Sequence, residues 1–321
     1  EQLGCPAVIR PAYTLGGTGG GIAFSPEELE VIAGRGLALS PTTQVLIEES
    51  VLGWQEFEFE VLRDCGDDAV VICSMENLDA MGVHTGESIV VAPALTLPDT
   101  HYQRLRSSAL KVVRGLGIVG GCNVQFAFDP VSTDYVVIEV NPRASRTVPF
   151  VSKATGVPLA RLAVQAMLGQ PLPKMPSPLP THDVTVKVPT FSWLKLPGLD
   201  TVLGPEMKST GEAMGHGASF GTAYRRALAG SSRSLPRSGT VFLSISNRLK
   251  VDFQDVAQGL AGLGFRLVAT RGTAVHLRQA GLEVETVWRI SEGRQPDILG
   301  FMRSGDVDLV VNLPTGRRAQ T

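Results

Sequence analysis

The stretch Asn123–Arg143, NVQFAFDPVSTDYVVIEVNPR, contains two strand-like runs joined by a short polar loop. The runs 123–128 and 135–140 are rich in β-branched and aromatic residues, so they predict two strands of a hairpin. The position of the loop places Gln125 almost directly opposite Glu139. Strand alternation puts Glu139 and Asn141 on one face. The sequence therefore predicts that three oxygen-bearing side chains converge at this hairpin.

These side chains are of the kind that binds a hard cation. Carboxylate and amide oxygens suit Mg²⁺, so Gln125, Glu139 and Asn141 are interpreted as a metal site. Arg143 follows two positions later, where it could hold an anion next to the metal. The alternative is a solvated face of an exposed hairpin, but such a face would more often carry Lys, Thr or Ser.

A glycine-rich loop, TLGGTGGG at 14–21, is a second candidate site. Glycines let backbone N–H groups approach phosphate oxygens closely. The pattern is neither GxGxxG nor a Walker loop. We interpret it as a hairpin lid over a nucleotide, with Arg10 in the preceding strand available for a phosphate. The alternative is a flexible hairpin tip.

Composition limits the function classes. The 321 residues suggest two domains, and 43% hydrophobic with 19% charged residues is an ordinary globular mixture. A net charge of −2 shows no footprint for nucleic acid. No apolar run approaches a membrane span, and no signal peptide opens the chain. The four cysteines fit neither a zinc nor a redox pattern, so we expect thiols in a reducing, cytoplasmic compartment.

The organisation along the chain predicts three parts. Residues 1–170 alternate short strands and helices, and the first strand, 7–10, begins as if in the middle of a domain. Residues 171–237 are interpreted as a linker and bridging segment, Pro-rich at first and with few clear elements. Residues 238–321 follow a βα rhythm, which predicts a small doubly wound parallel sheet.

The last part contains a candidate ligand edge. Thr270, Thr273 and Asn312 follow or lie at the C-terminal ends of predicted parallel strands, where open α/β sheets bind ligands. A helix is predicted from Ala274, so Thr273 could cap it beside an anion. Such turns are also common without a ligand.

Several motifs together resemble one family. VIRPAYTLGG at 8–17, AMGVHTG at 80–86 and IEVNPR at 138–143 look like the ATP-grasp part of the carbamoyl-phosphate synthetase large chain. LGPEMKSTGE at 203–212 looks like the segment before its regulatory domain. TRGTA at 270–274 and NLPTGRR at 312–318 look like that regulatory domain, which has the methylglyoxal-synthase-like fold.

The resemblance implies a set of site residues. ATP contacts would be Arg10, Gly16, Gly17, Glu49, Val51, Glu56, Gly82, Val83 and His84, with Gln125 and Glu139. Mg²⁺ or Mn²⁺ would be held by Gln125, Glu139 and Asn141, as the hairpin argument also expects, and Arg143 would lie near bicarbonate and its phosphorylated form. K⁺ would lie near Asn77, Asp79 and Ser88. Effector contacts would be Lys250, Thr270, Thr273, Arg289 and Asn312.

The resemblance also implies partners and departures. Bicarbonate and ammonia-derived substrates, a glutaminase small subunit, an allosteric effector, and pyrimidine and arginine biosynthesis are the family's setting. Residues 12–86 resemble the first synthetase half, and the chain from about Thr147 resembles the end of the second, so we expect a splice of two halves. The family's preceding ATP-grasp subdomain is expected to be missing. Pro314 and Arg271 depart from the family's effector site.

The leading hypothesis is therefore an ATP-dependent ligase that phosphorylates bicarbonate or carbamate on the way to carbamoyl phosphate. A rival hypothesis is a non-catalytic effector-binding module with a remnant ATP-grasp scaffold. A third is another ATP-grasp ligase such as a biotin carboxylase, but the last domain argues against it.

Overall fold

The computed structural model describes residues 4–14, 18–79, 81–175, 183–193, 202–204, 207–231 and 235–314. The chain divides into two compact units, residues 1–233 and 234–321. Within the described ranges, no helix combines the length and apolarity needed to cross a membrane.

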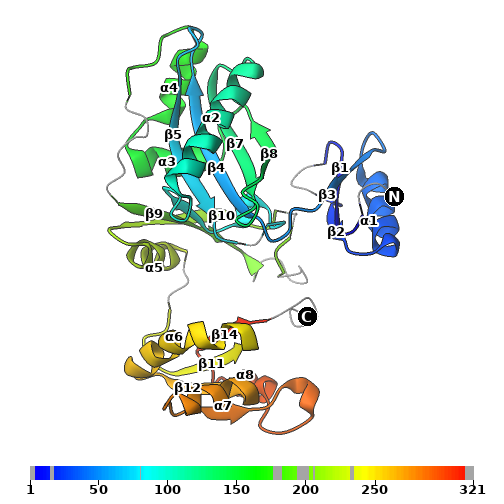
Figure 1. Cartoon of the computed structure of the whole chain (residues 1–321), viewed down its shortest axis with the longest axis vertical. Helices are drawn as coiled ribbons and strands as arrows, with labels where there is room; N and C mark the ends of the chain where they lie inside the picture. The colour runs from blue at the N-terminus through cyan, green and yellow to red at the C-terminus, as the bar shows by residue number, and fades with distance from the viewer. Residues whose placement is uncertain are drawn as a thin grey trace. The chain divides into compact units, whose positions relative to one another are not determined.

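Unit 1 begins with a small antiparallel sheet in the order β2-β1-β3, formed by Ala7–Pro11 (β1), Gly21–Ala23 (β2) and Val45–Glu49 (β3). Helix α1, Pro26–Leu39, packs on it (Figure 1). This helix was not predicted from the sequence, although local signals mark its start. The Ser25 side chain caps it by accepting the Glu28 N–H, and proline occupies the first turn.

The main body of unit 1 is a seven-stranded antiparallel sheet in the order β10-β9-β6-β5-β4-β7-β8. Its strands are Gln55–Arg63 (β4), Ala69–Asn77 (β5), Val90–Ala92 (β6), Gly120–Phe128 (β7), Tyr135–Asn141 (β8), Val184–Thr190 (β9) and Gly211–Gly217 (β10). The predicted hairpin 123–140 is confirmed as β7 and β8.

The two faces of this sheet differ. Helix α2, Asp99–Gly115, covers one face, where Phe57, Phe59 and Phe126 form a fully buried aromatic core. On the other face, α3 (Thr147–Thr155) and α4 (Leu159–Met167) cover only one end. The remainder of that face carries polar side chains, because β4 alternates phenylalanine with glutamate.

The segment 171–237 differs from the expected bridging segment. It contains β9, β10 and helix α5, Phe220–Gly230, which packs on both strands. Residues 176–182 of the predicted linker lie outside the described residues. The close approach of α5 requires glycine at Gly215, because a Cβ there would lie 2.0 Å from the Ala223 carbonyl oxygen. The segment therefore completes the sheet of unit 1.

Unit 2 has the parallel sheet that the sequence predicts, in the order β13-β12-β11-β14. Its strands are Thr240–Ile245 (β11), Arg266–Thr270 (β12), Glu285–Val287 (β13) and Leu309–Leu313 (β14). Helices α6, Lys250–Gly262, and α7, Arg271–Gln279, pack on one face. Helix α8, Ile298–Ser304, packs on the other, so the sheet is covered on both sides (Figure 1).

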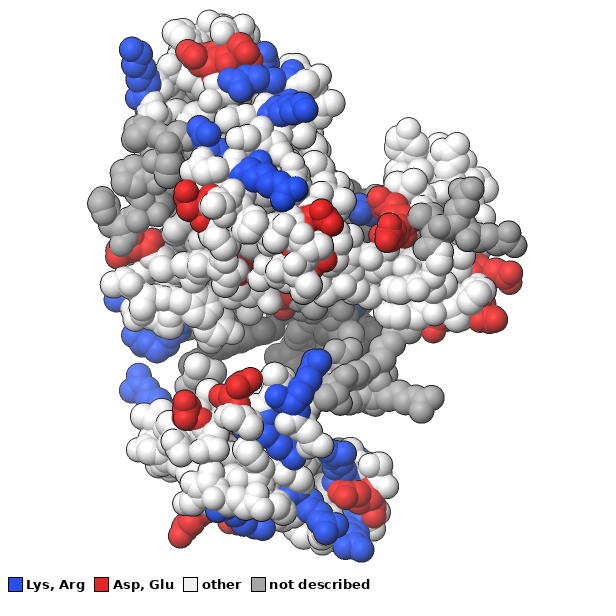
Figure 2. Space-filling view, viewed as in Figure 1, with Lys and Arg blue, Asp and Glu red and all other residues white. Residues whose placement is uncertain are grey.

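The charges on the surface are mixed. Figure 2 shows basic and acidic side chains interspersed over the visible face. Among the described residues, the visible face therefore shows no large patch of a single charge that would indicate a binding surface.

Candidate functional site

The β7–β8 hairpin brings the expected metal-binding side chains together. Gln125 pairs directly with Glu139, and Asn123 pairs with Asn141, with an irregularity after Gln125. Gln125 is buried, whereas Glu139 is exposed toward a cavity that both side chains line. The register thus places two oxygen donors opposite each other, with Asn141 two pairs further along the hairpin.

A row of glutamates on β4 continues this polar face. Glu56, Glu58 and Glu60 alternate with phenylalanines and are each no more than 5% exposed. Glu58 lies opposite Gln125, and Glu60 lies opposite Asn123. Only Glu56 was expected at the site. The alternation QEFEFEV at 55–61 was the available indication that the row forms one face.

Burial dominates the electrostatics of this row. Burial, followed by repulsion from Glu58 and Glu139, raises the pKa of Glu56 well above its usual value. One buried Glu56 oxygen has no hydrogen-bond partner among the described residues. Unlike Glu56, Glu58 is held at both oxygens, by the amide groups of Asn77 and Asn123, each at 2.9 Å. The free Glu56 oxygen is therefore available for a ligand.

The turn at His84 lies at the boundary between two cavities. Its Nδ1 accepts the Gly86 N–H at 3.0 Å, and its backbone N–H donates to the Gly204 carbonyl at 2.8 Å. Burial lowers the pKa of His84, which favours a neutral ring. Thr85, which the sequence analysis did not assign, also lines both cavities.

The larger cavity, about 460 Å³, contains most of the expected ATP contacts. It is lined by Arg10, Val51, Glu56, Gly82, Val83, His84, Gln125 and Glu139, together with Arg143. Glu49 lies on β3 and is not among the lining residues. Gly16 and Gly17 lie outside the described residues. The Arg10 guanidinium makes a 2.6 Å ion pair with Glu48 and is 45% exposed, so it remains accessible.

A second cavity of about 100 Å³ adjoins the expected metal-binding side chains and is rich in cations. Arg143, Arg146 and Lys187 line it along with Asn123, Glu139 and Asn141. Lys187 is 2% exposed and lies on β9, where its ammonium group is 3.3 Å from Glu212. Lys187 was not predicted as a site residue, although a lysine within the apolar run VTVKV at 184–188 is unusual.

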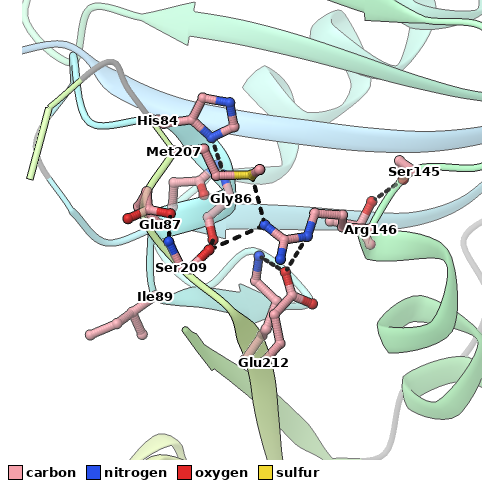
Figure 3. Close-up of polar contacts among 12 residues, drawn as sticks. His84, Gly86, Glu87, Ile89, Ser145, Arg146, Met207, Ser209 and Glu212 are labelled. Carbon is pink, nitrogen blue, oxygen red and sulfur yellow. Dashed lines mark hydrogen bonds and ion pairs between the residues drawn. The ribbon is translucent and has the colours of Figure 1, made fainter. Parts of the chain in front are cut away.

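The Arg146 guanidinium is held by a separate segment of chain (Figure 3). Its Nη1 donates to Met207 Sδ at 3.0 Å and to Ser209 Oγ at 3.2 Å. Its Nε lies 3.8 Å from Glu212. Figure 3 also shows that Glu87 contacts Ser209 from the turn that carries His84. Arg146 was not assigned from the sequence because its partners are more than 60 residues away.

The expected potassium residues lie at the end of β5 and in the segment that follows it. Asn77 donates to Glu58, and Asp79 accepts the Ile89 N–H at 2.6 Å. Burial raises the pKa of Asp79. Ser88 is buried and follows the Thr85–Glu87 turn (η2). These contacts leave the K⁺ assignment a prediction.

In unit 2 the expected effector residues gather around the C-terminal ends of β11 and β12. Lys250 Nζ donates to the Gly272 carbonyl at 2.7 Å. Thr273 does not precede its helix, because α7 begins at Arg271. Its hydroxyl instead contacts Ile245 and Thr270, and both threonines are at most 3% exposed. Asn312 lies exposed on β14.

The charges at this edge suit an anion. Burial, and then repulsion from the Arg289 guanidinium, lowers the pKa of Lys250. The buried Ser246 hydroxyl, which directly follows β11, has no hydrogen-bond partner among the described residues.

Comparison with family models gives two matches. Residues 1–175 match the model described as "Carbamoyl-phosphate synthase L chain, ATP binding domain". Residues 252–321 match the model described as "MGS-like domain". The first match lies within unit 1 and the second within unit 2.

Curated relatives extend this similarity. The chain is 41% identical over 98% of its length to the "Carbamoyl phosphate synthase large chain, C-terminal section" of Methanopyrus kandleri, and it covers 59% of that protein. It is 52% identical over 72% of its length to the large chain of Thermomicrobium roseum, of which it covers 22%. The chain therefore spans only part of these relatives. The first alignment runs through the expected junction near Thr147, and the expectation of two spliced halves stays a prediction.

Solved structures support the fold of unit 1. The biotin carboxylase domain of 2-oxoglutarate carboxylase from Hydrogenobacter thermophilus has a TM-score of 0.53 at 17% identity, covering 67% of this chain and 52% of that one. The N5-carboxyaminoimidazole ribonucleotide synthetase of Thermotoga maritima has a TM-score of 0.53 at 17% identity, covering 72% and 62%. These similarities show a shared fold, as the sequence analysis expected.

Proposed function

Because the chain belongs to the family of the carbamoyl-phosphate synthase large-chain ATP-binding domain, we propose that unit 1 transfers the γ-phosphoryl group of ATP to a small carboxylate anion. The acceptor is carbamate or bicarbonate. The product is carbamoyl phosphate in the first case and carboxyphosphate, an intermediate on the way to it, in the second. The observation that supports this most strongly is the position of a cation-rich cavity directly beside the Gln125–Glu139 pair.

The two cavities supply complementary charge. The larger one offers Arg10 to the nucleotide phosphates. The smaller one offers Arg143, Arg146 and Lys187 to the anionic acceptor, and the last two are held in place by contacts with Glu212 and Ser209. Since phosphoryl transfer depends on positioning and charge stabilisation more than on covalent chemistry, such an arrangement suits the reaction.

The donor set fits Mg²⁺ or Mn²⁺. Gln125, Glu139 and Asn141 would hold it through oxygen atoms, and the bound ion would supply charge stabilisation for the transferring phosphoryl group. The hairpin presents these side chains toward the same cavities that the cations line. These residues would therefore hold a metal where the two cavities adjoin.

The transfer itself needs no general base, because the acceptor is already an anion. A carboxylate oxygen of the acceptor attacks the γ-phosphorus, and the bond between this phosphorus and the bridging oxygen breaks. ADP leaves with the electron pair. Arg143 and Arg146 hold the acceptor, and the neutral His84 ring orders the turn between the cavities. The resemblance implies that the second synthetase half phosphorylates carbamate. We favour carbamate as the acceptor because the relative aligned over almost the whole chain is a C-terminal section.

The reverse reaction tests this function. The purified chain is incubated with Mg²⁺, ADP and carbamoyl phosphate, and ATP is measured with luciferase. Formation of ATP that depends on carbamoyl phosphate supports carbamate as the acceptor, and bicarbonate-stimulated ATP hydrolysis supports bicarbonate. The absence of both reactions would contradict the proposed function.

For unit 2 we propose the binding of a small anionic effector. The closeness of Lys250 and Arg289 supports this, because a bound anion would offset the repulsion between the two positive charges. Calorimetric titration with inorganic phosphate and nucleoside monophosphates tests it, with Lys250→Met expected to remove binding. K⁺ near Asn77 and ammonia from a separate glutaminase subunit remain further parts of the proposal.

A further inference from the structure

Glu87 is a buried carboxylate that belongs to neither cavity. It is fully buried at the end of the Thr85–Glu87 turn. Its Oε1 accepts the backbone N–H groups of Lys208 at 2.9 Å and Ser209 at 2.6 Å, more than 120 residues further along the chain. A buried carboxylate held by two backbone donors is a strong anchor, because charge-assisted hydrogen bonds are the strong ones.

The segment that Glu87 anchors carries the partners of Arg146. Ser209 Oγ and Met207 Sδ both accept from Arg146 Nη1 (Figure 3). Gly86, beside Glu87, leaves little room on the other side, because a Cβ there would lie 3.1 Å from Arg146 Nη1. The position of the guanidinium is therefore fixed between the turn and the anchored segment.

The turn that carries Glu87 and the Arg146 side chain both adjoin the proposed site. The turn begins at Thr85, directly after His84, and both residues line the nucleotide cavity and the smaller cavity. Arg146 lines the smaller cavity, where the acceptor anion is proposed to bind. We propose that Glu87 is a positioning residue that sets the Arg146 guanidinium against the acceptor anion, an inference that rests on the proposed function of unit 1.

The chain offers a matched control. Glu76 is also buried, and it also accepts two consecutive backbone N–H groups, those of Leu95 and Thr96, at 2.8 and 2.9 Å. It lines neither cavity. Glu76→Ala therefore removes a comparable anchor without affecting Arg146.

The experiment compares Glu87→Ala, Glu87→Gln and Glu76→Ala in the full chain. For Glu87→Ala, the KM for carbamoyl phosphate in ATP formation should rise about 10- to 100-fold, because catalysis is sensitive to small displacements of a binding group. The Kd for MgADP should change less than about threefold. Glu87→Gln keeps an acceptor oxygen and should recover most of the loss, and Glu76→Ala should leave the KM unchanged.

A double-substitution test separates positioning from general stability. In an Arg146→Gln background, Glu87→Ala should raise the KM little further, because the group that it positions is already gone. Equal effects of Glu87→Ala and Glu76→Ala, or a full additional effect in the Arg146→Gln background, would overturn the inference while the proposed function stands.

The affinity for inorganic phosphate, measured by calorimetry in the presence of MgADP, gives a second measurement. If the wild-type chain binds phosphate but forms no ATP, the proposed function fails, and weaker phosphate binding by Glu87→Ala alone still supports the inference. If the wild-type chain binds neither phosphate nor carbamoyl phosphate, the inference also fails.

Discussion

The ammonium group of Lys187 lies 3.3 Å from the Glu212 carboxylate, and the lysine side chain is only 2% exposed. The two residues lie on neighbouring strands, β9 and β10, of the same antiparallel sheet. Within the described part of the chain, Glu212 is the one acceptor found for this ammonium group. A buried cation with a single carboxylate partner depends strongly on that partner.

Glu212→Ala should therefore destabilise unit 1 by about 3 kcal/mol, because it leaves a buried charge without its partner. Urea unfolding at neutral pH measures the change. The control is Glu285→Ala, which removes a partner of Arg266 in a pair about half exposed on both sides. Exposed pairs contribute about 1 kcal/mol or less. Equal losses for the two variants would contradict the assignment of a buried pair.

Glu139→Gln should reduce metal-dependent phosphoryl transfer about 100-fold or more, because it removes the charged member of the proposed metal-binding set. The reaction between MgADP and carbamoyl phosphate gives the rate, and the thermal midpoint checks the fold. Asp134→Asn, in the exposed loop of the same hairpin, should retain full activity. Unchanged turnover in Glu139→Gln would rule out this metal site.

The hairpin shows how much of the site is local. Gln125 and Glu139 are 14 positions apart, so loop geometry and strand alternation were sufficient to predict that they face each other. Arg146 contacts Ser209, more than 60 residues away, and Lys187 reaches the same face because β9 pairs with β6, where Val90 lies opposite it. No local pattern encodes such contacts, since they depend on the sheet order β9-β6-β5-β4-β7-β8.

The parallel sheet of unit 2 was predictable for the same reason, because each βα unit is local. The bridging segment was not, because β9 and β10 obtain their burial from α5 and β6. Their glycines and polar residues, as in GEAMGHG at 211–217, give a weak strand pattern. Here tertiary packing decided the secondary structure.

Glu56→Gln should stabilise the ligand-free chain at neutral pH. Burial raises the pKa of Glu56 well above its usual value, so the folded state favours the protonated carboxyl. The stability it contributes is present below the unfolded-state pKa and is lost as pH rises through the folded-state pKa. A neutral glutamine avoids this loss. Thermal unfolding between pH 4 and pH 8 should show an advantage that grows with pH, and a constant difference would contradict the burial argument.

Gly215→Ala should destabilise unit 1 by about 3 kcal/mol, because its Cβ would lie 2.0 Å from the Ala223 carbonyl oxygen and 2.4 Å from the Ala227 nitrogen. Backbone atoms of a packed helix cannot move aside as a flexible side chain can. Gly221→Ala is the control, since its Cβ would meet nothing within 4 Å. It should be neutral or slightly stabilising in helix α5. Similar stability of the two variants would show that α5 does not pack against β10 as described.

The two units should unfold in separate transitions. Each has a hydrophobic core of its own, built around Phe59 in unit 1 and Leu243 in unit 2. Both side chains are fully buried, so Leu243→Ala should remove about 3 kcal/mol from unit 2, and Phe59→Ala a similar amount from unit 1. Differential scanning calorimetry should resolve two peaks, and each substitution should lower the midpoint temperature of only one of them. A peak assigned to unit 1 should also rise in temperature with MgADP, because a ligand stabilises only the unit that it binds. If Leu243→Ala shifts both peaks together, or if a single cooperative transition moves as a whole, the two cores do not act as independent folding units.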